Sequence, residues 1–150
     1  MPEHKNNVLV LERVVNAPSD LVWKAFTDIT LLKQWMPFFP KFEARVGFET
    51  RFMLGKDPEH QYEHICKVLE VIPHKKLTYT WYYEGYSGKS HVSYELFSQG
   101  KKTKVVLTHT ITEAFPDSPH FAKKNFVEGW TYMIDEVKKF VEEVTKHGRK

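Results

Sequence analysis

The sequence predicts an α+β domain in which a strongly curved antiparallel β-sheet wraps around a long C-terminal helix. Two observations carry this prediction. The hydrophobic period changes from about 3.6 to about 2 near Lys41, and one amphipathic stripe of about seven turns closes the chain. A chain of 150 residues has the usual size of one domain, and nothing across residues 1–150 indicates a linker or a repeat.

The start of the chain predicts one strand and two short helices. Residues 8–15 form a β-rich run that ends at the Asn16-Ala17-Pro18 break. Pro18 is well placed to open a helix, because its missing N–H would be unpaired in the first turn anyway. Residues 19–26 then carry apolar side chains at helical spacing, and a second helix over about 30–35 stops before Pro37.

The central part of the chain alternates between apolar and polar residues, as the strands of a half-buried sheet do. The predicted strands cover residues 42–46, 48–52, 65–72, 77–83, 91–97 and 103–113. Gly47 permits a bend between the first two strands, and a hairpin turn around Gly100 joins the last two. Short turns between neighbours predict an antiparallel meander, which the first strand of the chain closes.

The C-terminal helix has the clearest signals. Ser118 is a good N-cap, and Pro119 is a good first helical residue. The apolar side chains that follow share one helical face: Phe126, Trp130, Met133, Ile134, Val137, Phe140, Val141 and Val144. A helix with one apolar face lies along a sheet. A sheet curved around it tends to leave space between the two, so we expect a small-molecule cavity there.

Composition argues against several classes of protein. The formal net charge of +3 is mild, and part of it falls on Lys146, Arg149 and Lys150 in an expected solvated tail, so no basic stripe indicates nucleic-acid binding. The single cysteine, Cys66, leaves no intramolecular disulfide. No hydrophobic leader opens the sequence, and no window approaches the roughly 18 apolar residues of a membrane span. We therefore expect a cytoplasmic protein.

A set of short strings, in order, resembles a known family. The strings are Ala17-Pro18, Val22-Trp23, Lys33-Gln34-Trp35, Arg45-Val46-Gly47, residues 68–73, 77–81 and 103–109, and Gly129-Trp130. Over residues 8–144 the chain resembles the START-like (Bet v 1-like, SRPBCC) superfamily, in the branch related to the C-terminal domain of the activator of Hsp90 ATPase. The resemblance implies a helix-grip fold with a deep cavity between sheet and helix. It also implies apolar ligands such as lipids, polyketides or hormones. Some members are cyclases or hydrolases, and the eukaryotic domain assists a chaperone.

Two positions depart from that family pattern. Phe48 stands where a second glycine is expected after Gly47, and Cys66 stands where a glycine usually precedes Val68 by two residues. If these positions face the cavity, its shape differs from that of its relatives, and at Cys66 its reactivity differs too. A buried, inert thiol is the simpler interpretation of Cys66.

Aromatic residues are abundant, with 11 Phe, 7 Tyr and 4 Trp, and rigid rings can wall a cavity as well as fill a core. We expect the cavity to be lined by Trp35, Phe39, Phe52, Cys66, Tyr79, Trp81, Tyr94, His109, Phe126 and Trp130. His109 is either a polar anchor for a ligand or a half-buried histidine bonded to a neighbouring hydroxyl. The apolar loop over residues 36–40 either caps the core, gates the cavity or contributes to a dimer contact.

One apparent catalytic motif is rejected. The string from His60 to His64 matches the H-x-x-E-H pattern of inverted zinc metalloproteases, which needs both histidines on one helical face. Here the string runs into a β-rich segment. On a strand the two histidines would lie roughly 13 Å apart, which is too far for one zinc ion. We expect no metal, no cofactor and no catalytic set.

The sequence therefore favours a binding protein for a small apolar or amphipathic molecule, acting as a carrier or sensor. An enzyme of cyclase or hydrolase type is one alternative, with His109 as acid or base and Tyr79 or Tyr94 as a hydrogen-bond donor. A chaperone-interacting module that acts through its surface is the other. The oligomeric state is left open between monomer and homodimer.

Overall fold

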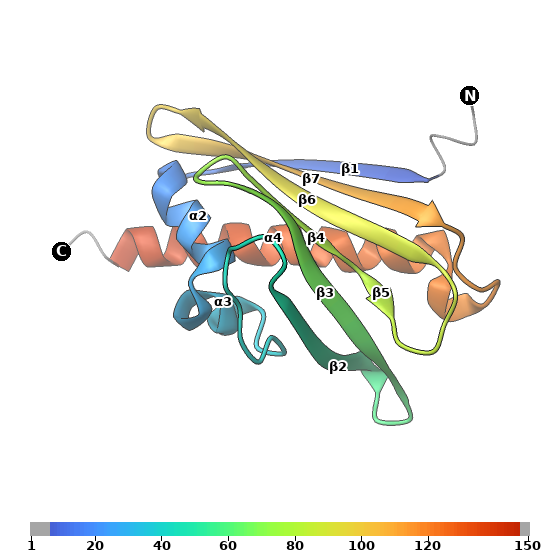
Figure 1. Ribbon diagram of the computed structural model, residues 1–150. Helices are drawn as coiled ribbons and strands as arrows, with labels where there is room; N and C mark the ends of the chain where they lie inside the picture. Colours follow the sequence, from blue (N-terminus) through green and yellow to red (C-terminus); the bar gives the residue numbers. More distant parts are fainter. Residues whose placement is uncertain (1–6, 148–150) are drawn as a thin grey trace.

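The sheet curves over the long helix α4, with the two short helices α2 and α3 at one end (Figure 1). A computed structural model describes residues 7–147 of the chain. Its elements are β1 (Val8–Val15), α2 (Ser19–Thr27), α3 (Ile29–Trp35), β2 (Glu49–Asp57), β3 (His60–Ile72), β4 (Lys76–Thr80), β5 (Tyr82–Tyr83), β6 (Lys89–Gln99), β7 (Lys102–Glu113), the 3-10 turn η1 (Pro119–Phe121) and α4 (Lys123–His147). The expected basic residues Arg149 and Lys150 lie outside the described residues.

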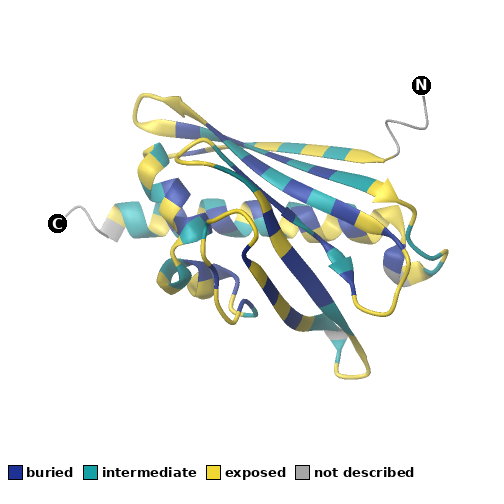
Figure 2. Ribbon diagram, viewed as in Figure 1, coloured by how far each residue is buried: buried dark blue, intermediate teal, exposed yellow. Residues whose placement is uncertain are grey.

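The sheet is antiparallel in every pairing, with strand order β1-β7-β6-β4-β3-β2, and β5 pairs with β3 off this path. Buried residues alternate with partly exposed ones along β6 and β7, as Figure 2 shows. The predicted α+β class and the helix-grip arrangement are therefore confirmed.

The first two helices begin and end where local chemistry places them. Pro18 is the N-cap of α2, with φ −71° and ψ 155°, so the helix begins one residue after it. Asp28 ends α2 and caps α3, because its side chain accepts a hydrogen bond from the Thr30 N–H at 2.9 Å. This shared residue explains why the two helices are joined almost without a linker.

The predicted strand over 42–46 is wrong, since this segment is irregular. The ladder to β3 starts only where Gly47 N–H donates to the Val68 carbonyl at 2.9 Å and Val68 N–H donates to Phe48 at 2.8 Å. Gly47 has φ 94°, a left-handed conformation that suits glycine. Phe42 is buried, so the apolar alternation here reflects a loop anchored on the core.

Two other strand predictions need correcting in their bounds. The β2–β3 hairpin is longer than predicted, and β3 includes the whole string from His60 to His64, which confirms that the string lies on a strand. The predicted strand over 77–83 is interrupted at Trp81, whose N–H donates to the Ser90 carbonyl at 2.9 Å. Leu77, Tyr79, Trp81 and Tyr83, which alternate along this segment, are all buried.

The long helix begins at Lys123, not at Pro119 as predicted. The preceding residues form the separate turn η1, and Ala122 is extended with ψ 148°, which breaks the helical path between them. The Asn125 side chain joins the two by donating to the Pro119 carbonyl at 2.6 Å. Ser118 makes no side-chain capping bond.

Two contacts tie α4 to the first strand. Arg13 Nε lies 2.7 Å from Asp135 Oδ1, and the Asn16 N–H donates to Glu142 Oε2 at 2.9 Å. They join residues more than a hundred positions apart in the sequence. With the buried stripe of Phe126, Trp130, Ile134, Val137 and Val141, they fix the helix under β1.

Aromatic side chains fill the interior beside α2 and α3. Phe26 stacks on Tyr94 with centroids 4.4 Å apart, and its ring meets Trp35 edge-on at 5.5 Å. Phe39 is completely buried and contacts Phe52 at 4.7 Å. This end of the sheet therefore has an ordinary packed core.

Candidate functional site

An apolar groove opens at the other end of the sheet, beside the first half of α4. It has a volume of about 660 Å³. We call it the α4 groove, and its lining residues are Phe38, Leu54, Gly55, His64, Trp81, Tyr83, Asn125, Phe126, Glu128, Gly129, Trp130, Tyr132 and Met133. Its size lies in the usual range of sites for small molecules.

The walls of the α4 groove are held by ring contacts. Trp130 meets Trp81 edge-on with centroids 4.7 Å apart. His64 packs edge-on against Trp81 at 5.0 Å and against Tyr83 at 4.7 Å. Behind it, Phe52 stacks on His64 at 5.2 Å. Interlocked rings lose little conformational freedom when a ligand binds, so the groove is largely pre-formed.

Two polar atoms stand out among the groove residues. Trp130 Nε1 is buried, and no residue of the described part of the chain accepts a hydrogen bond from it. His64 Nδ1 lies 2.8 Å from the Tyr62 carbonyl, which can only accept, so this nitrogen carries the proton. In the neutral ring Nε2 is then an acceptor.

His109 lies behind the groove wall. Its ring packs against Phe126 at 5.0 Å and Trp130 at 5.3 Å, and it is 2 % exposed. Its Nε2 lies 2.9 Å from Ser90 Oγ. The Ser90 hydroxyl donates its own proton to the Trp81 carbonyl, so it must accept from His109 Nε2–H. The hydroxyl partner expected for this histidine is thus present.

Burial controls the charge state of His109. Burial, with a smaller contribution from nearby His91, lowers the pKa of the imidazole from 6.5 to about 4. The ring is therefore neutral at pH 7. A neutral imidazole held in one tautomer by Ser90 is a fixed part of the wall.

The structure separates the ten predicted lining residues into three groups. Those that line the α4 groove are Trp81, Phe126 and Trp130. Those that contact a lining residue from behind are Phe52 and His109. Those in the packed interior are Trp35, Phe39, Cys66, Tyr79 and Tyr94. A role for any of them in ligand binding stays a prediction.

The polar atoms of Trp35, Tyr79 and Tyr94 in the packed interior form hydrogen bonds within the protein. Trp35 Nε1 donates to the Ala25 carbonyl at 2.8 Å. The hydroxyls of Tyr79 and Tyr94 lie 2.8 Å apart, and burial raises the pKa of both well above 10. Burial also raises the pKa of the Cys66 thiol well above 9. A protonated, buried thiol is inert, in line with its simpler interpretation.

Several groove residues escaped sequence reasoning. His64 was set aside with the zinc-protease string, although the same alternation that buries Phe52 on the paired strand places it inward. Tyr83 shares the inward face of Trp81 and could have been predicted from it. Gly129 could also have been noticed, because a glycine inside a long helix lowers helix stability and such a position often has a packing or functional role.

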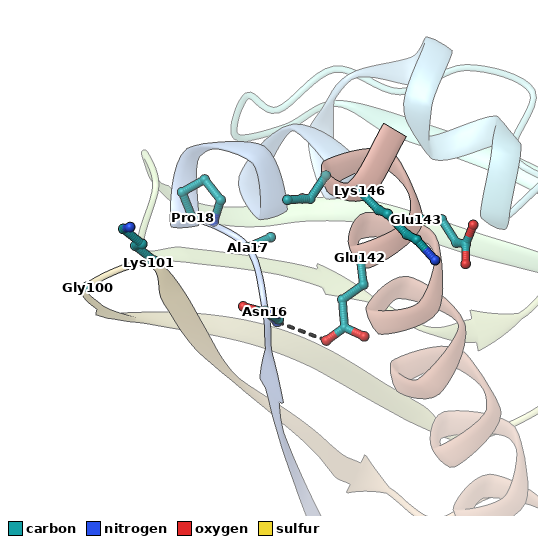
Figure 3. A pocket seen from close by; sticks show the side chains of 9 residues that line it. Asn16, Ala17, Pro18, Gly100, Lys101, Glu142, Glu143 and Lys146 are labelled. Atoms are coloured by element: carbon teal, nitrogen blue, oxygen red, sulfur yellow. Dashed lines mark hydrogen bonds between the residues drawn. The ribbon is translucent and has the colours of Figure 1, made fainter. Parts of the chain in front are cut away.

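A second hollow lies where β1 meets α2, beneath the β6–β7 turn and the end of α4 (Figure 3). Its volume is about 740 Å³, and its lining includes Asn16, Lys101, Glu142 and Lys146. Glu142 is already engaged there, because it accepts from the Asn16 N–H and lies 2.6 Å from Lys138 Nζ. This hollow is a polar structural junction, and the α4 groove is the better candidate for a ligand site.

Across residues 7–147, no three His, Cys, Asp or Glu side chains gather closely enough to hold a metal ion. Within the same part of the chain, no helix has the length and apolar character needed to cross a membrane.

Comparison with known proteins gives one family match and many structural matches. The family model described as activator of Hsp90 ATPase homolog 1-like protein matches residues 16–142. Protein CV1439 of Chromobacterium violaceum has a similar structure, with TM-score 0.75 and 23% identity over 95% of this chain and 99% of that one. CalU16 of Micromonospora echinospora gives TM-score 0.64 and 26% identity over 93% and 79%. No curated protein matches this chain.

Proposed function

The chain belongs to the activator of Hsp90 ATPase homolog 1-like family, and we propose that it binds a small apolar or amphipathic molecule in the α4 groove. The observation that carries the proposal is the groove itself, with its aromatic walls and few polar atoms. Concave apolar sites with a small number of placed polar groups are the usual form of a small-molecule site. The buried free thiol of Cys66 is in keeping with a reducing compartment such as the cytoplasm.

Binding is favoured over catalysis by the state of the candidate acid–base groups. His109 is neutral and bonded to Ser90, and it lies behind the groove wall. Tyr79 and Tyr94 bond to each other in the packed interior, away from the residues that line the groove. An acid or base must reach the reacting atoms, and none of these three groups is among the residues that line the groove.

Gly129 offers a direct test, because it lines the groove and a Cβ placed on it would meet no atom within 4 Å. We expect Gly129→Phe to fill the groove and weaken binding of the neutral probe N-phenyl-1-naphthylamine at least about tenfold, or about 1.4 kcal/mol. Probe fluorescence, which rises in apolar surroundings, measures the affinity.

Gly129→Ala is the matched control. It adds one methyl group and should keep most of the affinity, while it stabilises the helix by about 1 kcal/mol. Thermal unfolding of both variants shows that any lost binding is not lost folding. Equal probe affinity in the wild type and Gly129→Phe would contradict the proposal. Absence of binding in the wild type would favour a surface-mediated role with a protein partner instead.

A further inference from the structure

We infer that the α4 groove selects an uncharged ligand that carries a hydrogen-bond-accepting oxygen, such as a carbonyl or hydroxyl oxygen placed at Trp130, and rejects carboxylates. This inference rests on the proposed function. It is argued from the polar atoms and charges of the groove.

The first argument is the buried indole N–H. Within residues 7–147, four side-chain polar atoms are buried without a partner, on Thr50, Thr78, Trp130 and Thr145. Only Trp130 among them belongs to the groove lining. A buried donor without an acceptor is costly, and a ligand oxygen at this position would remove that cost. The indole donates only, so the matching ligand atom must accept.

The second argument is the neighbouring histidine. His64 and Trp130 both pack against Trp81, with ring centroids 5.0 Å and 4.7 Å from the centroid of that ring. The Nδ1–H of His64 donates to the Tyr62 carbonyl at 2.8 Å. This proton is engaged by the protein backbone, so it does not serve as a donor to a carboxylate.

The third argument is charge. Of the described residues that line the groove, Glu128 is the one carboxylate, and no lysine or arginine is among them. A carboxylate entering the groove would lose water without gaining a cation, which is unfavourable. It would also approach the negative charge of Glu128. An uncharged oxygen avoids both costs while still reaching Trp130.

Three ligands of nearly equal shape separate these effects: 2-acetylnaphthalene, 2-isopropylnaphthalene and 2-naphthoate. Calorimetric titration at neutral pH compares the wild type with Trp130→Phe, which removes the N–H and keeps an aromatic ring. The wild type should bind 2-naphthoate at least about tenfold more weakly than 2-acetylnaphthalene. Trp130→Phe should weaken 2-acetylnaphthalene about five- to tenfold and change 2-isopropylnaphthalene less than about twofold.

The outcomes distinguish this inference from the proposed function. If both neutral ligands bind but Trp130→Phe weakens them equally, or if 2-naphthoate binds as tightly as the ketone, the inference is wrong and the proposed function stands. If no naphthalene binds the wild type, both are overturned. The comparison of the ketone with the carboxylate needs only the wild type, so it decides the charge argument even if the variant does not fold.

Discussion

Replacing Phe39 with alanine is expected to lower the free energy of unfolding by about 3–5 kcal/mol, the range for removing a large buried aromatic side chain. Phe39 is 0 % exposed, and its ring lies within 6.1 Å of four others, on Phe38, Phe42, Phe52 and Tyr79. These rings come from the loop after α3, from β2 and from β4. A cavity at their centre cannot close without moving all of these segments.

Urea unfolding measures this loss, and Phe97→Ala is the matched control. Phe97 is 46 % exposed and has Lys104 Nζ 5.6 Å from its ring centroid, so its removal should cost less than about 1 kcal/mol. A loss below about 1 kcal/mol for Phe39→Ala would mean that the loop over residues 36–40 does not cap the core. The expected result would mean that the loop caps the core through Phe39. The neighbouring Phe38 lines the groove.

Sequence periodicity predicted much of the fold, because alternation reports which face of a strand is buried. Over residues 77–83 the alternating Leu77, Tyr79, Trp81 and Tyr83 are all buried, as this reasoning requires. It could not locate the break at Trp81, which depends on a hydrogen bond to Ser90 on another strand. It also misread residues 42–46, since a loop anchored by Phe42 shows the same alternation as a strand.

The position of the groove could not be predicted from the sequence. Trp81 and Tyr79 share one face of the sheet, yet Trp81 lines the groove and Tyr79 is packed inside. The difference arises from α2 and the loop after α3, which bring Phe26 and Phe39 against the Tyr79–Tyr94 pair. Which end of a curved sheet is filled depends on such contacts between distant segments, and spacing along the chain does not record them.

This division of the interior gives the two ends of the sheet different surroundings. The end beside α2 and α3 buries its aromatic rings fully and supplies stability. At the other end Gly129 leaves the α4 surface without a side chain, and the rings of Trp81 and Trp130 remain at a groove wall. His109 lies behind that wall, in contact with Trp130, and its protonation depends on pH.

The second large effect is expected in the pH dependence of stability. Above about pH 6.5 His109 is neutral in both the folded and the unfolded state and contributes no difference. Below that pH the unfolded chain takes up a proton, whereas the folded protein does so only near its pKa of about 4. The unfolded state then binds more protons, so the free energy of unfolding falls as the pH falls, by about 2–3 kcal/mol between pH 7.5 and pH 4.5.

His109→Gln isolates this contribution, because glutamine does not titrate and its amide can still donate to Ser90. Carboxylates titrate in both proteins, so the difference between their two pH profiles reports the histidine. We expect the wild type to lose about 2–3 kcal/mol more than His109→Gln over this range, measured by urea unfolding at each pH. If the free energies of unfolding of the two proteins changed with pH in parallel, protonation of the His109 imidazole would cost the folded protein little stability. In that case His109 could not be the neutral, fixed element of the groove wall that its bond to Ser90 and its burial describe.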